Sequence, residues 1–463
     1  MNYWNVVDDN ELARIHEATM KVLAEEGVAI LWPEAVEIFR RHGAKVDGKK
    51  VYIPSGLVEE FLAAAPASFT LSARNPAQDL TIGLGQAPLY APTVGVVFVL
   101  EPDYRRRPAT VADQENFLRF SQLSDVCALS CGGLVYPQEL QGRSGLLTQM
   151  YNALVLSDKP VLGLSQDGEI ARRSLSMAAL ARGDSSGLYT LAIINSFSPL
   201  AWDEKMLQAL VAYAEKGQPI VVTCCSLMGL SSPLGIGETV VCNNAELLAG
   251  ITLAQLVNPG TPVVYGNTST AVEMRQMNCT LGAPEYALIS ALSGQLARYY
   301  CLPYRSGGGL SDAKAVDAQA GVESALNLKQ ARDAGVNLMF HALGAMDSFL
   351  SISYEKWLLD EETIGRIDRL YNGAPPLQED LLASIGQVGA MGNYLDHETT
   401  FANYNSLLYT PPLANRDNYE VWRAKGETFL AHTSQKVSER LAAYEQPYLE
   451  KSVAKQLRSF LTD

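Results

Sequence analysis

Two short apolar segments of the chain end in residues that could bind a ligand or take part in catalysis. In residues 303–312, Arg305 and Ser306 precede three consecutive glycines and an aspartate. In residues 336–348, an apolar run leads to His341. A buried strand that opens into Gly, Ser, Asp and His is typical of the carboxyl edge of a parallel sheet. Barrels and open α/β sheets bind their ligands at that edge, so we expect the chemistry here, with His341 near its centre.

Other apolar segments also end in side chains that could face a ligand, and most of these are aromatic or neutral. The candidates are Tyr136, Gln166, Asn195, Phe197, Cys224, Cys225, Tyr265 and Phe349. A zinc site needs three or four converging ligands, and here only one of the two cysteines together with His341 could contribute. We therefore expect no metal site.

Gly307, Gly308 and Gly309, together with Asp312, are candidates for cofactor binding. Backbone N–H groups of a glycine-rich turn at a helix N-terminus can hold a phosphate. No Gly-Lys-Ser/Thr sequence follows these glycines, so close packing at a strand end is the alternative. His341 also has two interpretations, structural or catalytic, and its place at the sheet edge favours the catalytic one.

A repeated strand–loop–helix pattern must position these residues. It begins near residue 127, and each short apolar strand is followed by a helix, as in βαβ units. The predicted strands are residues 127–132, 160–165, 189–195, 219–225, 261–267, 304–308 and 338–341. Seven such units favour an eight-fold β/α (TIM) barrel over an open sheet. The eighth strand could be residues 94–100 or a segment that the pattern does not reveal.

The sequence outside this pattern divides into two flanking regions. Residues 1–110 form short helices and alternating strands, which predict an irregular α+β collar rather than a dinucleotide-binding unit. Residues 111–370 form the barrel. Residues 371–463 are predicted to be a helical tail that packs outside the barrel.

Composition limits the possible partners. The formal net charge of −14 argues against nucleic acid or an anionic membrane surface, because both require a basic footprint. The first residues lack the basic start and apolar run of a signal peptide, and no uninterrupted apolar run approaches the ~20 residues of a membrane span. Seven cysteines at scattered spacings predict buried, reduced thiols. We expect a cytoplasmic protein.

Several longer segments resemble the trimethylamine methyltransferase family, in particular its branch without pyrrolysine, the glycine betaine methyltransferases and their relatives. These are IHEAT at 15–19, RPAT at 107–110, NAELLAG at 244–250, QLVNPGTPVVYG at 255–266, GAPE at 282–285, DAKAVDAQAGVE at 312–323 and SYEKWLLDEE at 353–362. The resemblance covers nearly the whole chain. It implies a β/α barrel that moves a methyl group from an amine to the cobalt of a separate corrinoid protein. The cobalamin would then belong to the partner, and the chain would bind no cofactor tightly; we also expect a homo-oligomer.

One departure from the family bears on the substrate. The founding members carry pyrrolysine at the place equivalent to Ser348 or Phe349, where this chain has ordinary residues. A tertiary amine must be activated before it can lose a methyl group, whereas a quaternary ammonium leaves as a neutral amine. The resemblance therefore implies a betaine-type substrate, such as glycine betaine, proline betaine, carnitine or butyrobetaine.

A betaine has two ends that the site must bind. Aromatic faces suit the cationic end, and our candidates are Tyr136, Phe197, Tyr265 and Phe349, for each of which core packing is the alternative. Hydrogen-bond donors suit the carboxylate, and the candidates are His341, Asn195, Arg305 and Ser306. We expect His341 to lead among them.

Three alternative functions remain open from the sequence. The protein could demethylate a tertiary amine such as trimethylamine. It could be a zinc-dependent corrinoid methyltransferase for methanol or a thiol, which would need a Cys/His ligand set. It could also be a betaine-binding protein with the same aromatic cage and no catalytic activity.

Overall fold

The computed structural model describes residues 3–375 and 380–461; residues 1–2, 376–379 and 462–463, which fall in the predicted collar and tail, lie outside the described residues. Its centre is a sheet of eight parallel strands in the order β6-β19-β18-β15-β13-β11-β10-β9. The strands are β6 (Leu89–Pro92), β9 (Ser130–Cys131), β10 (Val161–Leu162), β11 (Thr190–Asn195), β13 (Ile220–Cys224), β15 (Val263–Asn267), β18 (Tyr304–Gly307) and β19 (Leu338–Leu343). A parallel bridge from Tyr90 to Cys127 closes the sheet into a barrel.

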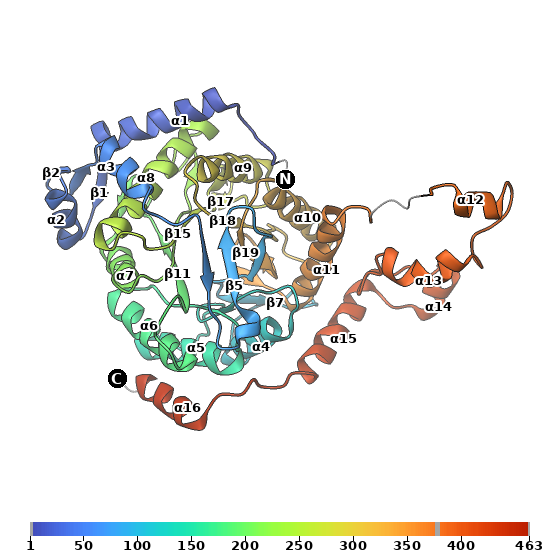
Figure 1. Ribbon diagram of the computed structural model, residues 1–463. Helices are drawn as coiled ribbons and strands as arrows, with labels where there is room; N and C mark the ends of the chain where they lie inside the picture. Colours follow the sequence, from blue (N-terminus) through green and yellow to red (C-terminus); the bar gives the residue numbers. More distant parts are fainter. Residues whose placement is uncertain (1–2, 376–379, 462–463) are drawn as a thin grey trace.

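Eight helices surround this sheet, one after each strand (Figure 1). They are α4 (Val111–Leu123), α5 (Gly142–Leu156), α6 (Gly168–Arg182), α7 (Glu204–Glu215), α8 (Ile236–Val257), α9 (Pro284–Tyr299), α10 (Ala318–Asp333) and α11 (Tyr354–Tyr371). Side chains at the N-caps of α4, α6, α7, α10 and α11 accept backbone N–H bonds, which is what Thr, Asp and Ser favour there. The predicted β/α barrel is confirmed.

The seven predicted strands correspond to seven of the barrel strands, but the eighth was not placed correctly. It is β6, within the range predicted as collar, so the barrel takes its first strand from before residue 110. Residues 94–100, the candidate we named, instead supply β7 (Phe98–Leu100) to a small sheet with β8 (Arg106–Pro108), β20 (Ala345–Met346) and β21 (Ser351–Ile352). The strands of that sheet belong to the segments that follow β6 and β19 in the chain, so the sheet lies at the carboxyl end of the barrel.

The amino-terminal end of the barrel is covered by a hairpin. Its strands are β4 (Ser68–Leu71) and β5 (Leu80–Gly83), which pair antiparallel as the alternation predicts. The Asn337 side chain, just before β19, donates to the Gly83 carbonyl, and the Ser72 N–H donates to Leu188, just before β11. A ligand site therefore has access only from the other end.

The remaining N-terminal elements lie on the outside of α8. They are α1 (Asp9–Lys21) with a π-helical turn at Val22–Glu26, β1 (Val28–Ile30), α2 (Pro33–Arg41), β2 (Lys45–Asp47), β3 (Lys50–Tyr52) and α3 (Ser55–Leu62). Helix α8 is long and apolar enough to span a membrane by length and composition alone. However, 83% of its most apolar window is buried inside the protein, so we interpret it as a core helix.

The C-terminal part begins with three helices that project from the barrel: α12 (Ala383–Val388), α13 (Glu398–Leu407) and α14 (Tyr419–Lys425) (Figure 1). None of these three helices buries a side chain. The chain then returns: α15 (Phe429–Ala442) contacts α11 and α4, and α16 (Lys451–Arg458) contacts α5 and α6. Among the described helices of the tail, α15 and α16 pack against the barrel helices as expected.

Candidate active site

A cavity of about 380 Å³ lies at the carboxyl end of the barrel strands. About half of its lining residues are glycine or apolar, and nine polar or aromatic side chains from different strand ends complete it. Its lining comprises Val94, Gly95, Gly133, Tyr136, Leu162, Gly163, Leu164, Ser165, Gln166, Ile193, Asn195, Met206, Cys225, Thr268, Arg305, His341 and Phe349. The volume suits a ligand of a few to a dozen heavy atoms.

Arg305 and His341 form the polar pair of this cavity. Arg305 comes from β18 and His341 from β19, and the two side chains are 2% and 6% exposed. The guanidinium Nη2 lies 3.2 Å from His341 Nε2, while Nη1 donates to the hydroxyls of Thr268 at 2.8 Å and Thr223 at 3.2 Å. These bonds fix the plane of the guanidinium in the barrel.

Burial and the neighbouring Arg305 determine the charge of His341, and the hydrogen bond between the two side chains determines its tautomer. Burial first, and the adjacent Arg305 charge second, hold the pKa of His341 well below its ordinary value of 6.5, so the ring is neutral. Because Arg305 can only donate, His341 Nε2 accepts, and the ring proton is on Nδ1. Nδ1 and Arg305 Nε are both buried without a hydrogen-bond partner among the described residues. The pair therefore has two N–H donors left for a ligand.

Arg305 carries a charge that no carboxylate among the described residues compensates. Burial lowers the pKa of its guanidinium, and the groups that oppose this shift are tyrosine and cysteine side chains rather than aspartate or glutamate. An arginine retains its proton even so. Among the described residues that line the cavity there is no Asp or Glu. A buried, unpaired cation is costly, and an anionic group on a ligand would relieve this cost.

The backbone at His341 is irregular in a way that turns its side chain into the cavity. His341 has φ +52°, and the pairing of β19 with β6 shifts register between Met339 and Leu343. Such a β-bulge inserts a residue and re-aims its side chain. Phe349 also has positive φ, +73°, and its ring centroid lies 4.4 Å from that of His341. Non-glycine residues in this region are strained, and they persist only where surrounding contacts hold them.

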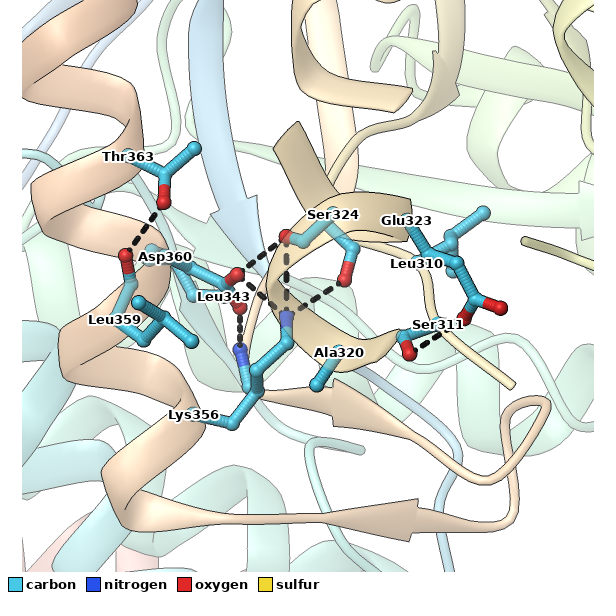
Figure 2. Close-up of polar contacts among 12 residues, drawn as sticks. Leu310, Ser311, Ala320, Glu323, Ser324, Leu343, Lys356, Leu359, Asp360 and Thr363 are labelled. Atoms are coloured by element: carbon cyan, nitrogen blue, oxygen red, sulfur yellow. Dashed lines mark hydrogen bonds and ion pairs between the residues drawn. The ribbon is translucent and has the colours of Figure 1, made fainter. Parts of the chain in front are cut away.

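A buried network between α10 and α11 supplies such contacts (Figure 2). The Lys356 ammonium lies 2.5 Å from Asp360 and donates to the Ser324 hydroxyl and the Gly309 carbonyl, both at 3.1 Å. The second Asp360 oxygen accepts from the Gly344 N–H at 2.7 Å. Gly309 follows β18 and Gly344 follows β19, so this ion pair fixes the two strand ends that carry Arg305 and His341.

The loop after β19 has its own anchors. Asp347 lies 2.7 Å from Arg106 of β8, and the Ser348 hydroxyl donates to Asp312 at 2.7 Å. The other bonds of Asp312 come from the backbone N–H groups of Leu281 and Gly282, both at 2.9 Å. Its carboxylate is thus occupied in joining the loops after β15, β18 and β19.

Five of the predicted site residues meet at the cavity, and seven do not. Tyr136, Asn195, Arg305, His341 and Phe349 line it. Tyr265 points outward and donates to Asn244 on α8, Ser306 bonds to Tyr286 and Ser290 on α9, and Phe197 is 60% exposed outside the cavity. The others that do not line it are Gly307, Gly308, Gly309 and Asp312.

Close packing accounts for the triple glycine. A Cβ on Gly308 would lie 2.9 Å from the Leu328 side chain, and one on Gly309 would lie 2.4 Å from the Ala342 carbonyl oxygen. These glycines allow β18 and the chain after it to approach α10 and β19. Their buried position gives no support to the predicted role in cofactor binding.

Sequence reasoning named Gln166 and Cys225 only as strand-end residues and missed Thr268. Gln166 donates to the Tyr136 hydroxyl at 3.0 Å, and burial raises the pKa of Tyr136, so its ring is neutral. Desolvation raises the pKa of the Cys225 thiol to about 11, so this side chain is also neutral.

Within residues 3–375 and 380–461, no three His, Cys, Asp or Glu side chains form a group that could hold a metal ion. The donor set thus lends no support to a zinc-dependent mechanism.

Comparisons with known proteins agree with the barrel fold and also identify the family of the chain. The family model described as trimethylamine methyltransferase matches residues 1–463. The glycine betaine methyltransferase of Desulfitobacterium hafniense is 38% identical over 99% of this chain and 96% of its own length. The proline betaine:corrinoid methyltransferase of Eubacterium limosum is 32% identical over 100% of this chain and 98% of its own length.

Among solved structures, the monomethylamine methyltransferase of Methanosarcina barkeri matches with a TM-score of 0.56 at 11% identity, over 96% of this chain and 90% of its own. At this identity the match supports the fold alone. The full-length family match and the two relatives at more than 30% identity decide the classification. The chain belongs to the trimethylamine methyltransferase family.

Proposed function

We propose that the protein transfers a methyl group from a betaine-type quaternary amine to the Co(I) of a corrinoid carried by a separate protein. Relatives that match nearly the whole chain are named for glycine betaine and proline betaine, and the latter also for a corrinoid. The corrinoid is a second substrate here, and it supplies the nucleophile that accepts the methyl group. The amine leaves with the electron pair of the broken C–N bond, as a neutral tertiary amine.

The observation that carries the substrate class is the unpaired charge of Arg305. The cavity holds one buried cation and, among the described lining residues, no carboxylate. A betaine carboxylate would accept from Arg305 Nε and His341 Nδ1, the two donors without partners. Trimethylamine has no anionic group to accept from the two donors together, and its protonated form would be repelled by the guanidinium. The site therefore favours a zwitterion over a simple amine.

The two ends of the substrate would then contact different side chains of the cavity. With the carboxylate on Arg305 and His341, the trimethylammonium end would lie against the rings of Tyr136 and Phe349, the two predicted cage residues that line the cavity. The Phe349 ring is adjacent to that of His341, so it would border both ends of the substrate. Each cation–π contact contributes about 1–2 kcal/mol when water is excluded. No acid is needed, because the leaving amine is neutral. Catalysis by the chain thus consists of holding the methyl carbon in line for attack, which can contribute several kcal/mol.

The corrinoid partner must approach the same end of the barrel, because the opposite end is closed by the β4–β5 hairpin. Loops after β11, β13 and β15 expose large apolar side chains there. These are Phe197, Leu230, Leu234, Met274 and Met277, each at least 54% exposed. Exposed apolar groups around a mouth suit a protein partner. Phe197, which we predicted for the substrate cage, fits this outer surface instead.

The experiment is a demethylation assay with free Co(I) cobalamin, followed by the absorbance change on methylation. Glycine betaine, proline betaine, carnitine, tetramethylammonium and trimethylamine are compared at equal concentration. We expect turnover of at least one carboxylate-bearing quaternary amine and little of the other two. Turnover of trimethylamine alone would favour the tertiary-amine alternative, and binding without turnover would favour a betaine-binding protein.

A further inference from the structure

Tyr136 and Gln166 form a second polar pair in the cavity. Gln166 Nε2 donates to the Tyr136 hydroxyl at 3.0 Å, and both side chains line the cavity. The other amide atom, Gln166 Oε1, is buried without a hydrogen-bond partner among the described residues. The Tyr136 hydroxyl accepts the bond from Gln166, and none of the described residues accepts its proton. The pair thus has one hydrogen-bond acceptor and one donor left for a ligand.

The strand before Gln166 lies across the barrel from the strand of Arg305. In the closed ring of eight strands, β10 leads to Gln166 and is four places from β18 in either direction. The Tyr136 N–H donates to the Val96 carbonyl at 2.8 Å. Gln166 directly precedes Asp167, which caps the N-terminus of α6. Backbone contacts therefore fix both residues, and the cavity has polar groups on opposite sides.

The space beside the Tyr136 hydroxyl is open to a ligand. A Cβ on Gly133 would lie 3.1 Å from the phenol oxygen, so the glycine leaves room there, and Gly133 itself lines the cavity. The last torsion of a glutamine side chain is broad, and a turn about it presents Gln166 Oε1 to the same space. A donor and an acceptor then face one point of the cavity.

A hydroxyl is the ligand group that suits this pair. It can accept from the Tyr136 O–H and donate to Gln166 Oε1 at the same time, whereas a methylene satisfies neither and a carboxylate satisfies only the donor. An ordered water has the same two capacities and suits the pair in the free protein. A ligand that displaces this water without replacing its bonds loses affinity. The pair therefore discriminates between ligands with and without a hydroxyl at this place.

We propose that Tyr136 and Gln166 form a hydroxyl subsite, and that the substrate is a betaine with a hydroxyl on the carbon chain between carboxylate and ammonium. This inference rests on the proposed function, which assigns the carboxylate to Arg305 and His341. The carbon that bears the hydroxyl also bears the carboxylate arm and the ammonium arm, so contacts to all three fix its configuration. The hydroxyl orients the substrate and takes no part in the transfer of the methyl group.

The test uses carnitine and butyrobetaine, which differ only in such a hydroxyl. L-Carnitine, D-carnitine and butyrobetaine are compared as substrates of the full-length protein in the assay with Co(I) cobalamin. One carnitine enantiomer should have a kcat/KM about ten- to a hundredfold above those of its mirror image and of butyrobetaine. The reason is that the other two compounds leave a buried donor and acceptor unpaired.

Two variants each remove one half of the subsite. Tyr136→Phe removes the hydroxyl and keeps the ring for the ammonium, and Gln166→Met keeps the side-chain length and removes the amide. In both, the preference for carnitine over butyrobetaine should fall to about threefold or less. Ser165→Ala is the control, because Ser165 also lines the cavity but its hydroxyl donates to the Ile193 carbonyl at 2.7 Å. The control should keep the wild-type preference, and circular dichroism checks that each variant is folded.

Calorimetric titration without cobalamin makes the same comparison for binding, so the result does not depend on turnover. Tighter binding of carnitine that is lost in Gln166→Met, without any demethylation, would overturn the proposed function and support the subsite. Demethylation of butyrobetaine as fast as of either carnitine enantiomer would overturn the subsite alone. So would a preference for carnitine that persists in both variants. Failure of the wild type to bind any of these betaines would overturn both.

Discussion

Replacement of Arg305 by glutamine is the most direct test of how the cavity recognises its substrate. Arg305→Gln removes the charge and leaves a polar side chain that can still bond the neighbouring hydroxyls of Thr223 and Thr268. At about 4 Å and an effective dielectric of ~20, a carboxylate would gain about 4 kcal/mol from the guanidinium, from which desolvation subtracts. We take a net of about 3 kcal/mol, so kcat/KM for glycine betaine should fall ~150-fold.

Two comparisons make this result specific. Tetramethylammonium has the same reacting group without the carboxylate, so its kcat/KM should hold or rise when the repelling guanidinium is removed. Arg305→Lys keeps the charge but cannot reproduce the bonds to Thr223, Thr268 and His341, so its loss should be intermediate. Equal losses for both quaternary amines, or no loss for glycine betaine, would refute the assignment of Arg305 to the carboxylate.

The same variant should have an unusual effect on stability. Because Arg305 is buried without a carboxylate partner, removal of its charge relieves a desolvation cost in the substrate-free protein. We expect the free energy of unfolding of Arg305→Gln, measured in urea without substrate, to equal or exceed that of the wild type. Added glycine betaine should stabilise the wild type and not the variant. A clear loss of stability would mean that Arg305 serves the fold.

Four further outcomes are expected. Glycine betaine should be demethylated at least ten times faster than trimethylamine, a gap of about 1.4 kcal/mol in barrier; equal rates would contradict the argument from the leaving group. His341→Ala should stay folded and lower kcat/KM for the betaine ~10- to 100-fold, the worth of one charge-assisted hydrogen bond; a wild-type rate would make His341 a bystander. In the folded protein the pKa of His341 lies well below 6.5. On mild acidification, the imidazole therefore becomes protonated in the unfolded state and stays neutral in the folded state. The wild type should therefore lose about 1.4 kcal/mol more than His341→Gln between pH 7.5 and 5.5 in urea unfolding; parallel profiles would contradict the buried neutral ring. Lys356→Met strands the buried Asp360 charge and should cost ~3–5 kcal/mol of unfolding free energy, most of it recovered by adding Asp360→Leu; a loss that the second change leaves unaltered would show that the pair does not act as a unit.

The barrel could be predicted from the sequence because its strands are buried on both faces. All residues of β13, β15 and β19 are buried, and such strands appear as short continuous apolar runs between helices. Strand β6 was missed because it has only four residues, ends in proline and joins directly to another apolar stretch. An apolar run of that kind does not reveal which of its parts enters the barrel.

The site was predicted less well, because side chains of a barrel strand alternate between the interior and the helix layer. Arg305 points into the barrel, while Ser306 beside it points out to α9. Tyr265 likewise bonds to α8. Both outward residues were assigned to the substrate, since the sequence places them at a strand end but does not fix which face they occupy. At His341 the bulge breaks the alternation itself, so no periodic rule could have oriented that ring.

Several unfavourable features of this fold meet at one cavity, and their location is an argument about function. An unpaired buried guanidinium, an imidazole N–H without a partner and left-handed backbone at His341 and Phe349 all occur around one cavity. Single features of this kind also occur elsewhere, such as left-handed backbone at Leu200 and unpartnered side-chain atoms on Gln330. Around the cavity several occur together, and relaxation would remove them unless other contacts opposed it. Here the Lys356–Asp360 pair ties together the ends of β18 and β19, and thus opposes that relaxation from behind the site. A reaction whose leaving group needs no proton asks little of a protein beyond a fixed position for the methyl carbon. A cavity that combines a polar pair with two aromatic rings and is held from outside is suited to that single requirement.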